Sequence, residues 1–164
     1  MRCRLVGSEM CIRDRAYKAE GCPLAPSDNR QVSALELAIL LQRSDVFEWL
    51  ASDKTLVQNF GAEALVAACD THLQNKAAIE LLISKGVSID AISTHHYNCL
   101  YRAAELPDLA FFEYLLGLGA NPERKIVPAP EYQLEQSISV KEFILQRSAD
   151  YQALQNMMAK PEGK

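Results

Sequence analysis

The stretch 98-NCLYRAAELPDLAFFEYLLGLGAN-121 decides the fold that this sequence predicts. Apolar residues recur in it at helical spacing twice, first around Leu100 and again around Phe111, with a turn between the two groups. Gly119 follows the second group, at a place where glycine supplies the left-handed backbone that ends many helices. The stretch therefore predicts a pair of short amphipathic helices that a glycine closes.

The same helix pair occurs twice more, earlier in the chain. The two stretches are 33-SALELAILLQRSDVFEWLA-51 and 63-EALVAACDTHLQNKAAIELLI-83. Ser33 and Glu36 form a capping-box pattern at the start of the first pair, and Gly86 ends the second pair as Gly119 ends the third. Lys54 replaces that glycine in the first pair, so we expect a differently shaped exit there. A recurring helix pair predicts a solenoid, in which each repeat packs on its neighbours.

The residues that open and close these units resemble those of ankyrin repeats. Where that family has a Thr-Pro-Leu-His-like turn, the units have Ser33-Ala34-Leu35-Glu36, Glu63-Ala64-Leu65-Val66 and Asn98-Cys99-Leu100-Tyr101. The Gly-Ala exit of the family is matched by Gly119-Ala120-Asn121, and its finger tip by Gln58-Asn59-Phe60-Gly61. The Pro and His of the signature are absent, so the copies are divergent. The resemblance runs from Ala16 to about Lys160 and implies an all-α, ankyrin-type helix-turn-helix repeat solenoid with extended finger loops.

The repeat pattern also predicts how the chain is divided. After residues 1–15, we expect the exit and finger of a truncated repeat at 16–32, repeats at 33–62 and 63–97, a repeat with a long Pro-rich loop at 98–136, C-terminal capping helices at 137–160 and a tail at 161–164. Two registers compete in the capping helices. Ser139 with Glu142 forms a capping box, whereas Val140, Phe143 and Ile144 fill the apolar stripe better if the register shifts by one residue.

Residues Leu5–Arg15, LVGSEMCIRDR, follow neither a helix nor a strand period. They lack the apolar run of a signal peptide, and their acidic residues argue against a mitochondrial presequence. The stretch is similar, without a mismatch, to a translated transposase adapter from sequencing libraries. We therefore expect 1–15 not to be native, and the helices that precede the Gly21 exit to be missing.

Composition excludes several classes of protein. The formal net charge is −4, and it becomes −6 without Met1–Arg15, which holds four arginines and two acidic residues. Such a chain is a poor nucleic-acid binder, because that affinity depends on clustered Lys and Arg. No segment has the continuous apolar length of a membrane span. Cys22, Cys69 and Cys99 have no regular spacing, so we expect packed free thiols and a cytoplasmic location, with export as an effector left open.

The resemblance implies a protein-protein interaction module, an adaptor or scaffold that binds an unknown protein partner as a monomer. Its finger tips and the inner face of the first helices would form the binding surface. Transferred position by position, the partner-binding residues are Asn29, Arg30, Asn59, Phe60, Asp70, Thr94, His95, Tyr97, Glu105 and Leu106, with Val32, Leu40, Leu41 and Thr71 beside them. For each single residue, solvation in a loop is the competing interpretation. The alternative function is a C-terminal accessory or autoinhibitory array of a larger protein.

Catalytic motifs are not found in the sequence. The pair His95-His96 lacks further metal ligands at workable spacing, and no phosphate loop, paired carboxylates or HExxH is present. Of the five cysteines, the three outside Met1–Arg15 fit packing positions of the repeats, and so does Trp49. We therefore expect no enzyme activity, no cofactor and no metal.

Overall fold

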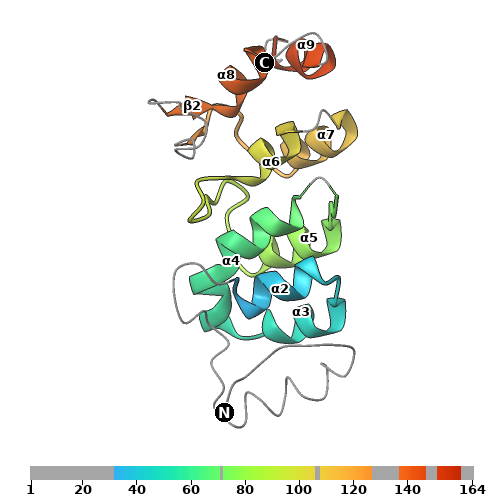
Figure 1. Cartoon of the computed structure of the whole chain (residues 1–164), viewed down its shortest axis with the longest axis vertical. Coiled ribbons are helices and arrows are strands. Elements are labelled where there is room, and N and C mark those ends of the chain that lie inside the picture. Colours follow the sequence, from blue (N-terminus) through green and yellow to red (C-terminus); the bar gives the residue numbers. More distant parts are fainter. Residues whose placement is uncertain (1–31, 71, 106–107, 127–136, 147–150, 160–164) are drawn as a thin grey trace.

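The computed structural model describes residues 32–70, 72–105, 108–126, 137–146 and 151–159. In these residues, helices stack in pairs along the long axis of the molecule (Figure 1). The helices are α2 (Ala34–Leu40), α3 (Ser44–Leu50), α4 (Lys54–Ala68), α5 (Lys76–Ser84), α6 (Cys99–Glu105), α7 (Leu109–Gly117), α8 (Val140–Leu145) and α9 (Gln152–Ala159). Two short antiparallel strands, β1 (Lys125–Ile126) and β2 (Ile138–Ser139), lie between the third and fourth pairs. The all-α repeat solenoid expected from the sequence is confirmed.

Polar side chains cap the N-termini of most of these helices. The capping residues are Ser33, Asp53, Asn75, Asp108 and Ser139. Each side-chain oxygen accepts a hydrogen bond from a backbone N–H of the first turn, which has no partner inside the helix. A cap of this kind contributes about 1 kcal/mol to helix stability. The helix starts are therefore encoded locally, at the residue that precedes each helix.

Glycines end the second and third helix pairs, as the sequence predicted. Gly86 has φ +93° and Gly119 has φ +90°, each two residues past the last helical residue. The N–H of Val87 donates to the carbonyl of Leu82 at 3.1 Å, which satisfies a carbonyl that the helix end leaves open. The first pair differs, because Lys54 is already the first residue of α4 and no finger follows α3.

Helix α4 corrects the expected position of one finger. Gln58-Asn59-Phe60-Gly61 was expected at a finger tip, but it lies inside α4, and the expected boundary between 62 and 63 also falls within this helix. Asp53 starts the helix by accepting from Thr55 N at 3.0 Å. Gly61 is accommodated because Val87 packs against it so closely that an added Cβ would lie 2.7 Å from Val87 Cγ2. Long-range packing thus outweighs the turn-like residue composition.

Small residues on the first helices bring the pairs close together. Ala38, Ala68 and Ala103 are each at most 1% exposed, and Leu35 and Leu100 beside them are equally buried. The core is continuous from α2 to α9, since every pair contributes buried apolar side chains to it. Each repeat therefore depends on its neighbours for burial of its apolar face.

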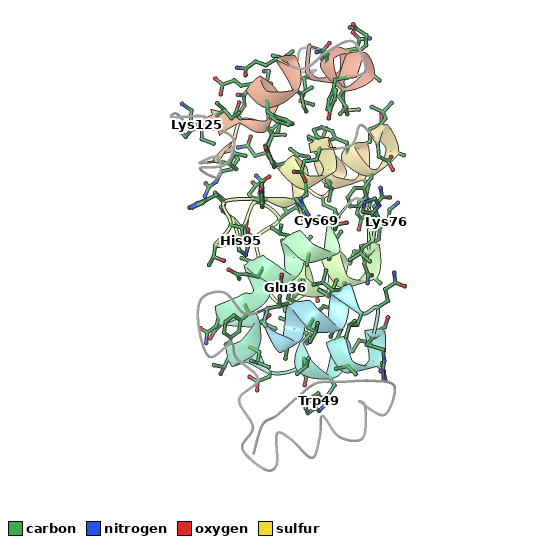
Figure 2. The ribbon with its side chains drawn as sticks, viewed as in Figure 1. Glu36, Trp49, Cys69, Lys76, His95 and Lys125 are labelled. Atoms are coloured by element: carbon green, nitrogen blue, oxygen red, sulfur yellow. A yellow bond between two sulfur atoms is a disulfide. The ribbon has the colours of Figure 1, made fainter. Side chains whose placement is uncertain are left out.

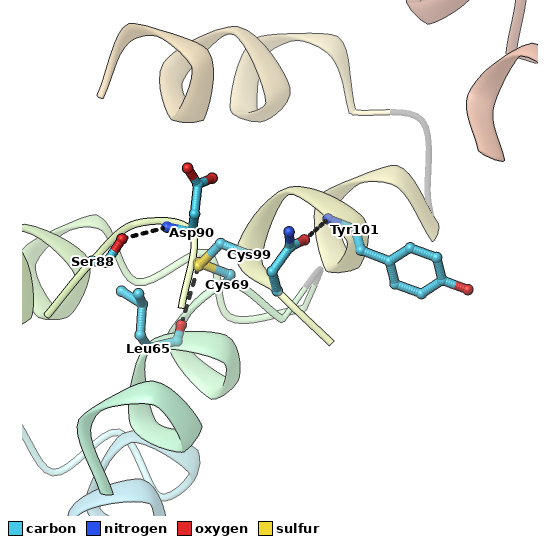
Figure 3. Close-up of a disulfide and its surroundings, with 7 residues drawn as sticks. Leu65, Cys69, Ser88, Asp90, Cys99 and Tyr101 are labelled. Carbon is cyan, nitrogen blue, oxygen red and sulfur yellow. Dashed lines mark hydrogen bonds between the residues drawn. A yellow bond between two sulfur atoms is a disulfide. The ribbon is translucent and has the colours of Figure 1, made fainter. Parts of the chain in front are cut away.

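Cys69 and Cys99 form a disulfide, which corrects the expectation of free thiols (Figure 3). The Cα atoms are 5.2 Å apart, and both residues are fully buried. Cys69 caps the C-terminus of α4 and Cys99 opens α6, so the bond joins two consecutive repeats. The sequence missed the pairing because the two positions are 30 residues apart and only the stacking of α6 on α4 brings them together. Cys22 lies outside the described residues.

The fourth helix pair combines both features that competed in the sequence. Ser139 and Glu142 form a complete capping box, while Val140, Phe143 and Ile144 are all buried. The ring of Phe143 lies 4.7 Å from that of Tyr101, centroid to centroid. The large side chain thus occupies the end of the core, where α6 meets α8. Most of the preceding Pro-rich loop, 127–136, lies outside the described residues.

None of the helices in the described part of the chain combines the length and apolar character needed to span a membrane.

Candidate functional site

A groove lies where α2, α4 and α6 meet the loop that connects α5 to α6. We call it the α2–α4 groove, and its cavity volume is about 160 Å³. Its residues are Glu36, Leu40, Glu63, Val66, Ala67, Asp70, Ser93, His95, Tyr97 and Arg102. Leu40, Val66 and Ala67 supply apolar surface, and the other residues are polar, charged or aromatic. The groove thus combines the inner faces of first helices with one finger loop.

A tight loop places His95 and Tyr97 at the groove. The N–H of Ser93 donates to the carbonyl of Tyr97 at 2.8 Å, and the N–H of His96 donates back to the carbonyl of Ser93 at 2.9 Å. His96 adopts the left-handed conformation, with φ +66°, that this tight turn requires. Figure 2 shows His95 on this loop and Glu36 below it, while Lys76 lies at the opposite edge of the stack. His95 and Tyr97 of this loop thus line the same cavity as Glu36.

Glu63 of α4 holds the tip of this loop. One of its carboxylate oxygens accepts a hydrogen bond from the backbone N–H of Thr94 at 3.2 Å. The hydroxyl of Ser93, itself buried, accepts a second bond from the N–H of Tyr97 at 3.3 Å. The finger is thus hydrogen-bonded to the helix on which part of the groove is built.

Arg102 organises the charged end of the groove. Its guanidinium forms ion pairs with Asp70, which follows the C-cap of α4, at 2.7 Å, and with Glu105 of its own helix. The same guanidinium lies over the ring of Tyr97, 5.3 Å from the centroid. Tyr97 in turn stacks on Tyr101 with centroids 5.5 Å apart. Arg102 therefore compensates two carboxylates and orients one aromatic ring.

Glu36 and Glu63 leave the other end of the groove negative. Burial raises the pKa of Glu36, and the nearby charge of Glu63 raises this pKa further, while a hydrogen bond from the Ser33 backbone and the proximity of His95 oppose the increase. Among the described residues, no lysine or arginine forms an ion pair with either glutamate. Within the part of the chain that the structure describes, these two carboxylates thus face a small cavity with the imidazole of His95 nearby and without an ion pair to lysine or arginine.

The structure brings some of the expected binding residues together and separates others. Asp70, His95 and Tyr97 line the groove, and so does Leu40. Thr94 contributes its backbone to the finger anchor, and Glu105 pairs with Arg102. Asn59 and Phe60 lie on α4 away from the groove, the first exposed and the second half-buried. The predictions for Asn29, Arg30, Thr71 and Leu106 lie outside the described residues.

Several groove residues were missed in the sequence. Glu36 was assigned to the capping box alone, and its backbone N–H does donate to Ser33 Oγ at 3.1 Å. Glu63, Val66 and Ala67 lie in α4, but nothing local indicates that they face a finger about 30 residues further along the chain. Arg102 was missed because its pairing with Asp70, 32 positions away, has no local signal in the sequence.

The groups that line the groove are suited to binding the side chains of another protein. Its residues can supply carboxylate acceptors, a guanidinium, an imidazole, an aromatic face and an apolar floor, which are the groups that contact side chains at protein interfaces. Within the described residues, no group of three or more His, Cys, Asp or Glu lies close enough to hold a metal ion.

Comparisons with known proteins agree with this architecture. The family model for ankyrin repeats, in three copies, matches residues 35–126, which is more than half of the chain. The matched region runs from α2 to β1 and includes every residue of the α2–α4 groove. A comparison with curated proteins gave no match. The stacked helix pairs, the glycine exits and the family match together place this chain in the ankyrin-repeat family.

Proposed function

We propose that this chain is an adaptor or scaffold module that binds a protein partner in the α2–α4 groove. Ankyrin repeats indicate a protein-protein interaction module in general. The observation that supports the groove as the binding site is the meeting of Leu40, Asp70, His95 and Tyr97 in one cavity. Leu40 ends one first helix, Asp70 follows the C-cap of the next, and His95 and Tyr97 lie on a finger. The family resemblance assigns these positions to partner binding.

Exposure of an apolar side chain beside the groove adds to this argument. Leu40 is 42% exposed although it lines the cavity, so a partner that covers it removes apolar surface from water. Full burial of a leucine side chain contributes roughly 1.5 to 3 kcal/mol, so even partial burial is a useful contact. The ring of Tyr97 beside it is stacked and therefore rigid, which lowers the entropy lost on binding.

The experiment compares two leucines that occupy matching positions. Leu40 is the last residue of α2 and Leu145 is the last residue of α8, and both are exposed, but only Leu40 lines the groove. Binders are selected from a library of random linear peptides and measured by fluorescence anisotropy. We expect Leu40→Gln to weaken the selected peptides by roughly tenfold, as partial loss of a buried leucine contact predicts, and Leu145→Gln to leave them unchanged. Equal effects of both variants would contradict the proposal.

We also propose that the module acts as a monomer and without catalysis or nucleic acid, as its charge and composition predict. Sedimentation velocity across a range of concentrations tests the monomer. The cytoplasmic location stays a prediction, and the disulfide between Cys69 and Cys99 favours the alternative of export, because such bonds persist in oxidising compartments. Cell fractionation distinguishes the two locations, and trapping of free thiols in each fraction shows whether the bond between Cys69 and Cys99 is formed there.

A further inference from the structure

We propose that the α2–α4 groove recognises its partner through one arginine side chain, which enters the cavity between the carboxylates of Glu36 and Glu63. This inference rests on the proposed function and specifies the chemistry of the partner. It depends on three observations: the charge of the groove, its size and the nature of its walls.

The charge of the groove is the first observation. Arg102 is already engaged by Asp70 and Glu105, so it does not compensate the glutamates at the other end. Glu36 and Glu63 both line the cavity, and the charge of Glu63 helps to raise the pKa of Glu36. A cation between them removes this repulsion and gains two charge-assisted hydrogen bonds. This end of the groove, where no described lysine or arginine pairs with Glu36 or Glu63, is therefore complementary to a basic side chain.

The size of the groove is the second observation. Its volume of about 160 Å³ is below the roughly 300 to 1,000 Å³ that small-molecule sites typically have. A cavity of this size suits a single side chain of a peptide. The finger closes one side of it, because Glu63 accepts the hydrogen bond from Thr94 N while its carboxylate lines the cavity.

The walls of the groove are the third observation. Leu40, Val66 and Ala67 provide apolar surface next to the carboxylates. Arginine combines an aliphatic stem, which packs on such surface, with a planar guanidinium whose fixed donors match carboxylates. Lysine shares the charge but presents a compact, strongly hydrated ammonium, so it is expected to bind more weakly in the same place.

The test uses peptides selected on the native chain from a library of random linear peptides. In each selected peptide that Leu40→Gln weakens, arginine is replaced by citrulline, which has nearly the same shape but no charge. We expect this replacement to weaken binding to the native chain by roughly tenfold, as for a close charge pair at an interface. On a chain that carries both Glu36→Gln and Glu63→Gln, the same replacement should have little effect.

Two controls keep the result specific. Glu48→Gln changes an exposed glutamate on α3 that does not line the groove, so it should preserve the preference for arginine over citrulline. Thermal unfolding of each variant shows whether the fold is retained. A second test of the arginine site is the pKa of the Glu36 carboxyl, measured by NMR. Saturation with the arginine peptide should lower the pKa of the Glu36 carboxyl, whereas the citrulline peptide should not.

The outcomes separate this inference from the proposed function. Peptides that depend on Leu40 but bind equally well with citrulline would overturn the arginine site and leave the groove as the binding surface. A library that yields no peptide sensitive to Leu40→Gln would overturn both. An arginine preference that survives in the double variant would place the cation away from Glu36 and Glu63, which also overturns the inference.

Discussion

Cys69, the C-cap of α4, is bonded to Cys99, the first residue of α6, so two consecutive repeats are covalently joined inside the core. The two sulfur atoms are screened from solvent, since both residues are fully buried. Figure 3 shows the bond beside Leu65, whose carbonyl oxygen lies 3.4 Å from Cys99 Sγ. If two electrons and two protons reduce the bond to two thiols, the Cys99 thiol can donate to this carbonyl.

Loss of this disulfide should lower stability while the fold is retained. The bond closes a loop of 30 residues, and the chain-entropy account gives about 3 to 4 kcal/mol for a loop of that length. We expect Cys69→Ala with Cys99→Ala to reduce the free energy of unfolding by about this amount, measured by urea titration. Dithiothreitol should lower the Tm of the native chain and not that of the double variant. An equal Tm with and without dithiothreitol would argue against the bond.

Replacement of Gly61 by alanine should destabilise the chain, although Gly61 lies inside a helix. Alanine raises helix propensity by about 1 kcal/mol, but its Cβ would lie 2.7 Å from Val87 Cγ2, and overpacking costs about 1 to 3 kcal/mol. We expect Gly61→Ala to lower the free energy of unfolding and Val87→Ala to relieve part of that loss in the double variant. Gly117, the last residue of α7, is the matched control. Nothing lies within 4 Å of the Cβ added there, so Gly117→Ala should stabilise the chain.

Asp108 should make the third repeat sensitive to acid. Its pKa is lowered, first by the hydrogen bond from the Gln74 side chain at 2.8 Å and then by the one from Phe111 N at 3.1 Å. Because the folded pKa lies below the unfolded one, the contribution of Asp108 is present above the unfolded pKa and is lost as pH falls through the folded pKa. Asp108→Ala should cost about 1 kcal/mol at neutral pH, as for other N-caps, and less in acid.

The matching substitution Asp108→Asn separates charge from capping. Asparagine also caps helices well, so stability at neutral pH should change by only a few tenths of a kcal/mol, and the acid dependence from this position should disappear. Urea titrations of the native chain and the two variants at neutral and acidic pH measure both effects. A constant difference between the native chain and Asp108→Ala at all pH values would contradict the role of the charge.

The contribution of Glu36 to stability should depend on pH in the opposite direction to that of Asp108. Burial, followed by the charge of Glu63, raises its folded pKa, so the folded chain holds the proton more tightly than the unfolded chain. The contribution of Glu36 is therefore fully present below the unfolded pKa and is lost as pH rises through the folded pKa. We expect Glu36→Gln to raise the Tm at neutral pH and to have little effect in acid. A lower Tm at neutral pH, with no change in Glu48→Gln, would show that the charged form is needed for folding.

Local sequence predicted much of the fold, because the signals that it contains act over a few residues. Ser33 and Ser139 cap the helices that follow them, and Gly86 and Gly119 end helices in the left-handed conformation. The repeat of these signals, together with buried alanines at helical spacing, was enough to predict stacked helix pairs. The finger prediction at Asn59 and Phe60 was wrong, because the turn-like residues there are absorbed into α4 by packing of Gly61 on Val87.

The sequence by itself therefore determined where most helices start and end and that they pair, since capping and apolar periodicity are set by neighbours along the chain. Only the tertiary structure decided which residues form the groove and the disulfide. Glu63 meets Thr94 across 31 positions, Asp70 meets Arg102 across 32 and Cys69 meets Cys99 across 30. Each of these pairs spans about one repeat, so it forms only when one helix pair stacks on the next, and no local pattern in the chain encodes it.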